Sequence, residues 1–92
     1  MGLLQEVLGN SIHVTHYVNF NCCSGIEVEL SADGNYLQLL IVENPPGFCL
    51  CICRIEVNAE IANLAPGEYT VQVCWDDWGA GYMCEIETVV IP

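Results

Sequence analysis

Cysteines are the side chains of this chain with the most evident capacity for chemistry, at seven in 92 residues. Five of them form two groups: the segment NCC (21–23) carries two adjacent thiols, and CLCIC (49–53) carries three on alternate positions. Thiolates bind soft metal ions such as Zn²⁺ and Cu(I), whereas paired thiols form disulfides. The two groups therefore point either to a metal centre or to cross-strand bridges.

The spacing of CLCIC decides what this segment can do by itself. If 49–61 is a strand, Cys49, Cys51 and Cys53 share the core-facing side, and Arg54 faces solvent, where we expect an ion pair. Same-face neighbours on a strand lie roughly 6.6–6.8 Å apart. A disulfide needs Cβ atoms about 3.8 Å apart, and sulfurs on one zinc ion lie at a similar spacing. The three thiols therefore need partners from elsewhere, and NCC supplies them.

Two histidines precede NCC, and on a regular strand they face opposite sides. His16 shares its side with the apolar Ile12 and Val14, so it is a better ligand candidate than His13. The alternative is a core histidine that is hydrogen-bonded to the backbone. The predicted metal ligands are Cys22, Cys23, Cys49, Cys51, Cys53 and His16. Zn²⁺ is the expected ion, and another thiophilic metal stays open.

The last two cysteines are predicted to stay unpaired. Within 68–75, Cys74 alternates with polar residues on the outward side. A register that leaves the glutamates of the final strand in water places Cys84 inside. A one-residue slip would allow a Cys74–Cys84 bridge, but it would bury Glu85 or Glu87. We therefore expect Cys74 to be a lone thiol and Cys84 to be a small apolar filler.

Short apolar segments separated by glycine and proline predict an all-β chain. The turns are SADGN (31–35), NPPG (44–47), LAPGEY (64–69) and WGAG (78–81). The expected strands cover 11–20, 25–32, 36–43, 49–61, 68–75 and 83–91. This spacing is typical of a small immunoglobulin-like β-sandwich of about six to seven mainly antiparallel strands. Residues 1–92 are expected to form one domain, with 1–10 as an N-terminal extension that is a short helix or an edge strand.

Charge narrows the classes of partner. Twelve acidic residues stand against a single basic one, Arg54, so the net charge is −11. This balance excludes nucleic-acid binding, which requires cations at the phosphates, and disfavours anionic membrane surfaces. No run of about 18 apolar residues is present, so no transmembrane segment is expected. YLQLLIV (36–42) is apolar on both faces and predicts an inner strand or a subunit interface, hence a homo-oligomer.

NCC (21–23), CLCIC (49–53) and LAPGEYTVQV (64–73), in this order, resemble a set of small, uncharacterised bacterial β-sandwich proteins with the pattern NCC…CxCxC…LxPGxYxVxV. The resemblance covers roughly residues 12–75. It implies a sandwich fold and one functional group formed by the five grouped cysteines, and it implies no activity. Many relatives of this kind look exported and carry signal peptides, whereas MGLLQEVLGNS lacks the regions of a signal peptide, which leaves the compartment open.

Three functions follow for the grouped cysteines. The first is a non-enzymatic domain in which they hold a structural metal ion, since thiols are dense and a small domain needs a staple. The alternative is a secreted interaction or adhesion module with disulfides between NCC and CLCIC. An enzyme with a cysteine nucleophile is not expected, because most candidate thiols would be buried. WDDWGAGYM (75–83) predicts a hairpin whose tryptophans cover the sandwich end, with sugar or cation binding as the alternative.

Overall fold

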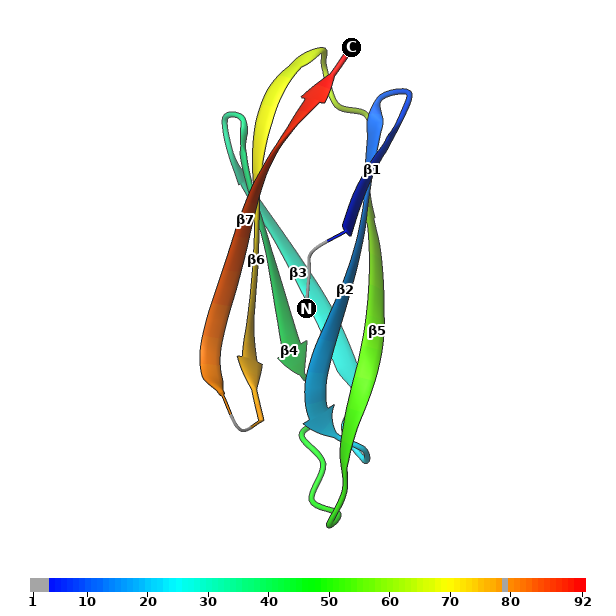
Figure 1. The fold of residues 1–92 in the computed structure, drawn as a ribbon, viewed down its shortest axis with the longest axis vertical. Coiled ribbons are helices and arrows are strands. Elements are labelled where there is room, and N and C mark those ends of the chain that lie inside the picture. The colour runs from blue at the N-terminus through cyan, green and yellow to red at the C-terminus, as the bar shows by residue number, and fades with distance from the viewer. Residues whose placement is uncertain (1–3, 79) are drawn as a thin grey trace.

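The computed structural model describes residues 4–78 and 80–92, and these residues form two packed β-sheets (Figure 1). The strands are β1 (Leu4–Leu8), β2 (Ser11–Asn21), β3 (Ile26–Asp33), β4 (Tyr36–Glu43), β5 (Ile52–Ile61), β6 (Gly67–Asp77) and β7 (Gly81–Ile91). One sheet has the order β1-β2-β5 and the other β3-β4-β6-β7. The predicted all-β sandwich is confirmed. In the part of the chain that is described, no helix has the length and apolar character needed to cross a bilayer.

The chain path brings distant segments to one end of the sandwich. All paired strands are antiparallel except β4 and β6, which run parallel because the chain crosses to β5 in the other sheet between them. As a result β2, β4 and β6 all end on the same side, which is the lower end in Figure 1. β5 and β7 begin there. This arrangement places 22–25, 44–51 and Trp78 beside one another.

The core follows the two-residue period of the strands. β2 alternates between partly exposed and buried residues as far as Phe20, and β4, which lies between β3 and β6, buries every second residue as far as Ile41. YLQLLIV (36–42) is therefore an inner strand, which was one of the two alternatives predicted for it. The buried apolar residues are Ile12, Val14, Val18, Phe20, Leu37, Leu39, Ile41, Val57, Ile61, Tyr69, Val71, Val73, Trp75 and Ile91.

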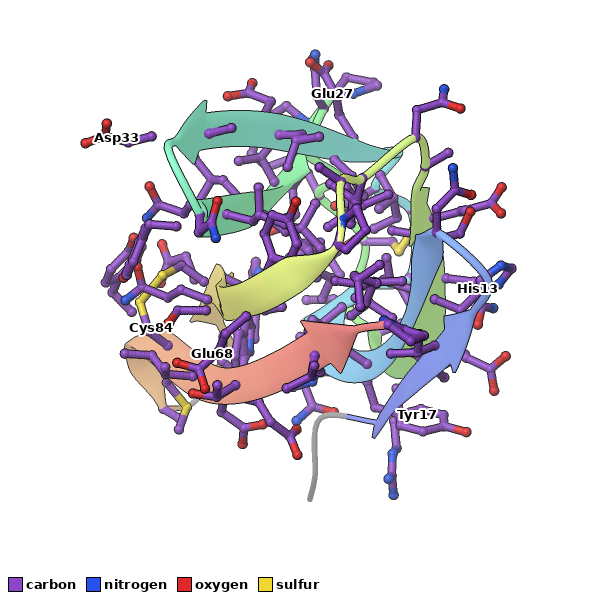
Figure 2. The ribbon with its side chains drawn as sticks, turned by 90° about the horizontal axis from the view of Figure 1, so that it is seen from above. His13, Tyr17, Glu27, Asp33, Glu68 and Cys84 are labelled. Carbon is purple, nitrogen blue, oxygen red and sulfur yellow. A yellow bond between two sulfur atoms is a disulfide. The ribbon has the colours of Figure 1, made fainter. Side chains whose placement is uncertain are left out.

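The outer face of β2 and β5 carries a ladder of polar pairs. The cross-strand bonds are His13–Glu60 at 2.9 Å, Thr15–Asn58 at 2.8 Å and Tyr17–Glu56 at 2.7 Å. Figure 2 shows His13 and Tyr17 pointing away from the sandwich. Arg54 also faces outward, as predicted, but its guanidinium carbon lies 4.6 Å from the centre of the Tyr17 ring. The positive charge therefore packs on an aromatic face, where an ion pair had been expected.

The Tyr17–Glu56 pair makes this outer ladder sensitive to pH. The hydrogen bond to the Glu56 carboxylate, and then its charge, raise the pKa of Tyr17 above 10.0. Hydrogen bonds from Asn58 and Tyr17 lower the pKa of Glu56 below 4.5. The raised tyrosine pKa stabilises the fold below the tyrosine's ordinary pKa, and the lowered glutamate pKa stabilises it above the glutamate's ordinary value. The pair therefore stabilises the fold between those two pH values.

Glu56→Gln is expected to lower the pKa of Tyr17, because the substituted side chain keeps an acceptor but loses the negative charge. The measurement is a pH titration of the Tyr17 ring signals by NMR. Glu60→Gln, on the same face but paired with His13, is the matched control and should leave the Tyr17 titration unchanged. An unaltered Tyr17 titration in Glu56→Gln would contradict this contact.

The predicted register of the last hairpin is wrong. Cys74 lies directly opposite Cys84, with the two sulfurs 2.10 Å apart, so the two residues form a disulfide. Cys74 is fully buried and Cys84 is exposed, the reverse of the prediction. The slip that this register requires does turn Glu85 inward. The carboxylate is not buried, because β7 is an edge strand and the Glu85 side chain stays 33 % exposed to solvent.

Cys74→Ser is accordingly expected to lower the free energy of unfolding by about 2–3 kcal/mol, since the bridge closes a short loop. Urea denaturation without reductant measures this. Cys84→Ser should cost a similar amount, and the double variant should cost no more than either single one, because all three remove the same bond. A negligible loss in Cys74→Ser would restore the original prediction of a lone thiol.

Candidate functional site: a cysteine clamp at one end of the sandwich

The five grouped cysteines meet where β2 ends and β5 begins. Cys23 and Cys49 have their sulfurs 2.12 Å apart. The Cys22 sulfur lies 2.12 Å from that of Cys53 and 2.30 Å from that of Cys51. We call these five residues the cysteine clamp. The structure thus brings NCC and CLCIC together, as the sequence predicted, and at bonding distances.

Valence limits what the cysteine clamp can hold at one time. A disulfide sulfur has one sulfur partner, so Cys22 bridges either Cys51 or Cys53. The Cys51 and Cys53 sulfurs lie 3.9 Å apart, close to each other but not bonded. With Cys23–Cys49 and Cys74–Cys84 also formed, three bridges use six of the seven cysteines. One thiol is left, and it belongs to Cys51 or Cys53.

CLCIC does not lie on a continuous strand, which corrects the prediction for 49–61. β5 begins at Ile52, so only Cys53 has the predicted strand geometry, and it pairs with the inward-facing Phe20. Cys49 and Cys51 lie in the preceding loop. This loop follows NPPG and is attached to NCC by its backbone, since the Cys22 N–H donates to the Cys51 carbonyl at 3.0 Å. Leaving the strand is what removes the 6.6–6.8 Å spacing that had excluded close contact.

Asn21 organises the cysteine clamp and was missed by the sequence analysis. Its side chain is 1 % exposed. Its Oδ1 accepts the N–H groups of Cys23 at 3.0 Å and Cys49 at 3.3 Å, and its Nδ2 donates to the Cys49 carbonyl at 2.5 Å. The bond to Cys23, two residues on, is an Asx turn, and an asparagine at the end of an apolar strand was the available signal. One side chain therefore fixes both cysteine segments.

The loop NPPG passes very close to NCC. A Cβ atom added at Gly47 would lie 2.4 Å from the Cys23 carbonyl carbon and 2.5 Å from the Ser24 nitrogen. Both of these are backbone atoms, so a side chain at this position has nowhere to go. The Gly47 N–H also donates to Ser24 Oγ at 2.7 Å. Glycine at position 47 is therefore what lets the two loops touch.

Two carboxylates connect the β6–β7 hairpin to β2 and to the loop that follows NCC. Glu43 accepts the indole N–H of Trp78 at 2.8 Å on one oxygen and the Ser24 hydroxyl on the other. Asp77, which is buried, accepts the Asn19 backbone N–H at 3.0 Å and the Trp75 indole N–H at 3.1 Å. Asp77 thereby joins β6 of one sheet to β2 of the other. These contacts fit the prediction that WDDWGAGYM (75–83) forms a hairpin.

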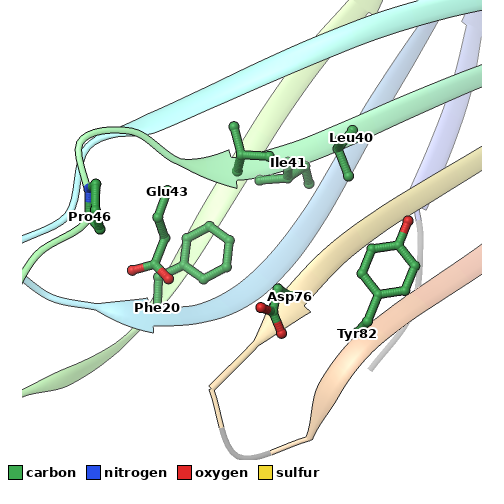
Figure 3. Close-up of a pocket in the computed structure, with 8 residues that line it drawn as sticks. Phe20, Leu40, Ile41, Glu43, Pro46, Asp76 and Tyr82 are labelled. Atoms are coloured by element: carbon green, nitrogen blue, oxygen red, sulfur yellow. The ribbon is translucent and has the colours of Figure 1, made fainter.

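A pocket lies where β4 and β6 separate (Figure 3). Their pairing ends at Ile41 and Trp75, while β6 continues to Asp77. Glu43 stands on one wall of the pocket, and Asp76 and Tyr82 stand on the other. Because the oxygens of Glu43 already accept hydrogen bonds from Trp78 and Ser24, this carboxylate is engaged in holding the end of the sandwich together.

The surface around the cysteine clamp is apolar. Phe48 is 92 % exposed, Leu50 107 %, Ile52 50 % and Trp78 47 %. We call these four residues the apolar rim. A surface pocket is lined by Cys49, Leu50, Cys51, Ile52 and Trp78, so two residues of the cysteine clamp border the same pocket as three residues of the apolar rim. Exposed apolar side chains gathered in this way are typical of interaction surfaces.

The predicted six-ligand metal site is assembled only in part. Among the described residues, Cys22, Cys51 and Cys53 have sulfurs within 4.8 Å of one another and could share an ion when reduced. Cys23 and Cys49 form their own pair. His16 lies on β2 six residues before Cys22, which is about 20 Å of extended chain, and it is fully buried with the centre of its ring 4.2 Å from that of Trp75. The histidine is thus a core residue.

All the contacts described above are made between residues of this one chain. The predicted likeness to bacterial sandwich proteins with the NCC…CxCxC pattern stays an expectation from the motif residues. Comparison with family models, curated proteins and solved structures found no match to the chain.

Proposed function

We propose that this chain is a non-enzymatic interaction module, in which a disulfide-bonded cysteine clamp holds the apolar rim in place for contact with another protein. The observation that supports it most is the bonding distance between the sulfurs of Cys23 and Cys49, with a second bridge from Cys22. Sulfurs that share a zinc ion lie about 3.8 Å apart, far beyond this distance. These distances favour disulfides over a metal ion as the cross-link that stabilises the domain.

The apolar rim is the part of the surface best suited to binding. Phe48 and Leu50 bury almost nothing within the chain, so their exposure contributes nothing to folding. The bridges and Asn21 fix the backbone on either side of them, which lowers the entropy lost on binding. Aromatic side chains on such a rigid base are typical of the residues that carry binding energy.

Charge indicates the chemistry of the partner. The chain carries −11 overall, and Arg54 is its only lysine or arginine. A surface with an apolar patch bordered by lysine or arginine would complement both the apolar rim and the negative charge of the whole chain. We therefore propose a basic protein surface as the partner.

A displayed peptide library tests this proposal. Peptides selected on the non-reduced protein are expected to combine apolar and basic residues, and to lose binding to the Phe48→Ser/Leu50→Ser double variant. Leu30→Ser is the matched control, because Leu30 is 52 % exposed on β3 and outside the rim. Selected peptides that bind the double variant as well as the parent protein would contradict the proposal.

A second candidate, a three-thiolate metal site, has one observation in its favour, the grouping of Cys22, Cys51 and Cys53. In a reducing compartment these sulfurs would be thiolates able to hold Zn²⁺ or Cu(I). Metal analysis of protein prepared under reducing conditions tests it. Less than one metal ion per three chains there would reject this candidate.

A further inference from the structure

We infer that Cys22, Cys51 and Cys53 form a thiol–disulfide exchange site that accepts small cationic disulfides. This inference rests on the oxidised cysteine clamp of the proposed function, but not on the partner protein. It starts from the leftover thiol, which is in contact with a disulfide and has no bridge of its own. Three sulfurs in one cluster, with Cys22 within bonding reach of both others, are the arrangement that exchange requires.

The three sulfurs are held in place by the backbone, independently of the bond between them. Cys22 is attached to Cys51 by the backbone hydrogen bond at 3.0 Å. Cys53 is held by its pairing with Phe20 in the β2–β5 ladder. The neighbouring Cys23–Cys49 bridge keeps the two segments joined when the Cys22 bridge opens. The reacting groups therefore stay close in either bonding state, which raises the rate of an intramolecular step.

The internal step moves one bond and involves no net oxidation, because the oxidation of the Cys51 sulfur is matched by the reduction of the Cys53 sulfur. In the Cys22–Cys53 form, the Cys51 thiolate attacks the Cys22 sulfur. The Cys51–Cys22 bond forms as the Cys22–Cys53 bond breaks, and Cys53 leaves as a thiolate that takes up a proton. The reverse step is the same reaction with the two outer sulfurs interchanged. The leftover thiol is thus shared between the two positions.

The external step uses the same thiol. Cys51 is exposed and Cys53 partly buried, so Cys51 is the sulfur that an incoming disulfide reaches. Its thiolate attacks one sulfur of the disulfide, forms a mixed disulfide, and releases the other half as a thiolate. Electrons balance, because one disulfide and one thiolate are consumed and one of each is produced. The Cys22–Cys53 bridge stays intact throughout.

The surroundings of Cys51 select the charge of the substrate. The surface pocket at Cys51 is walled by Leu50, Ile52 and Trp78, so the group carried by the disulfide would lie against the indole. An aromatic face attracts a cation, and the net charge of −11 raises the local concentration of cations further. A disulfide with ammonium groups should therefore react faster than one with carboxylates.

Mass spectrometry of alkylated protein tests the internal step. Protein prepared without reductant and alkylated with N-ethylmaleimide should carry one label per chain, divided between Cys51 and Cys53 in fragment spectra. Cys51→Ser and Cys53→Ser should each fold, keep a bridge to Cys22 and take no label. A label confined to one residue, or a variant that leaves Cys22 labelled, would overturn exchange while leaving the cysteine clamp intact. Several labels on the unmodified chain would instead reject the clamp.

Reaction with two disulfide probes tests the external step. Cystamine, which is cationic, should form a single adduct roughly tenfold or more faster than oxidised glutathione, with the difference shrinking as salt is added. Trp78→Ala should slow the cystamine reaction, and Trp78→Phe should largely retain it. Cys51→Ser should form no adduct. Equal rates for the two probes, or an adduct in Cys51→Ser, would overturn the proposed site.

Discussion

Complete reduction of the protein is expected to unfold it. Three bridges join segments that lie 26 to 31 residues apart at the cysteine clamp and 10 residues apart in the last hairpin. Each bridge of this kind stabilises a fold by about 2–4 kcal/mol, and a small domain has only about 5–15 kcal/mol in total. The three bridges together account for about 6–12 kcal/mol, which is comparable to the whole stability of such a domain, so the reduced chain should be largely unfolded. Urea denaturation with and without a phosphine reductant measures the change.

Single cysteine-to-serine variants should show how much stability each bridge contributes. Cys23→Ser removes one clamp bridge and should cost about 3–4 kcal/mol, while Cys51→Ser should cost much less, because Cys22 can still bridge Cys53. Such an asymmetry between two cysteines of the same cluster has no counterpart in a site where all sulfurs bind one metal ion. A reduced protein whose urea midpoint equals that of the oxidised protein would contradict the account.

Asn21→Ala is expected to cost about 2–4 kcal/mol, comparable to the loss of a bridge. The substitution leaves the Cys23 N–H and both backbone groups of Cys49 without the partner that now satisfies them. Buried polar groups left in this way cost about 1–3 kcal/mol each, and water reaching the loop offsets part of this. Thermal or urea denaturation of the oxidised variant provides the measurement.

Two neighbouring substitutions make the Asn21 result specific. Asn21→Asp keeps the two accepted hydrogen bonds and loses the donated one, so it should cost less than Asn21→Ala. Asn19→Ala is the matched control on the same strand, since Asn19 binds Asp77 and Trp78 through its backbone alone; its cost should stay within about 0.5 kcal/mol. Equal losses in Asn19→Ala and Asn21→Ala would show that Asn21 has no special role.

The sequence was sufficient for the fold and for the grouping of the sulfurs. Alternation in 11–20 correctly placed His16 inside and His13 outside, because a long regular strand obeys its two-residue period. The turns at SADGN and NPPG follow from the conformations of glycine and proline. The spacing of CLCIC indicated that its thiols need partners from elsewhere, and NCC, the predicted partner, lies within bonding distance of them.

The errors fall where tertiary contacts decide the local structure. Cys49 and Cys51 read as strand residues, but backbone bonds to NCC and Asn21 hold them in a loop. The hairpin register was judged by the cost of burying a glutamate, a cost that an edge strand does not impose on Glu85. Neither the order of strands in a sheet nor the neighbours of a loop can be worked out from periodicity.

The most direct test of the account is intact mass, disulfide mapping and metal analysis on protein purified without reductant. We expect three bridges, namely Cys23–Cys49, Cys74–Cys84 and one from Cys22 to Cys51 or Cys53, with one free thiol and no bound metal. One metal ion per chain, together with clamp thiols that become reactive only after chelation, would contradict it.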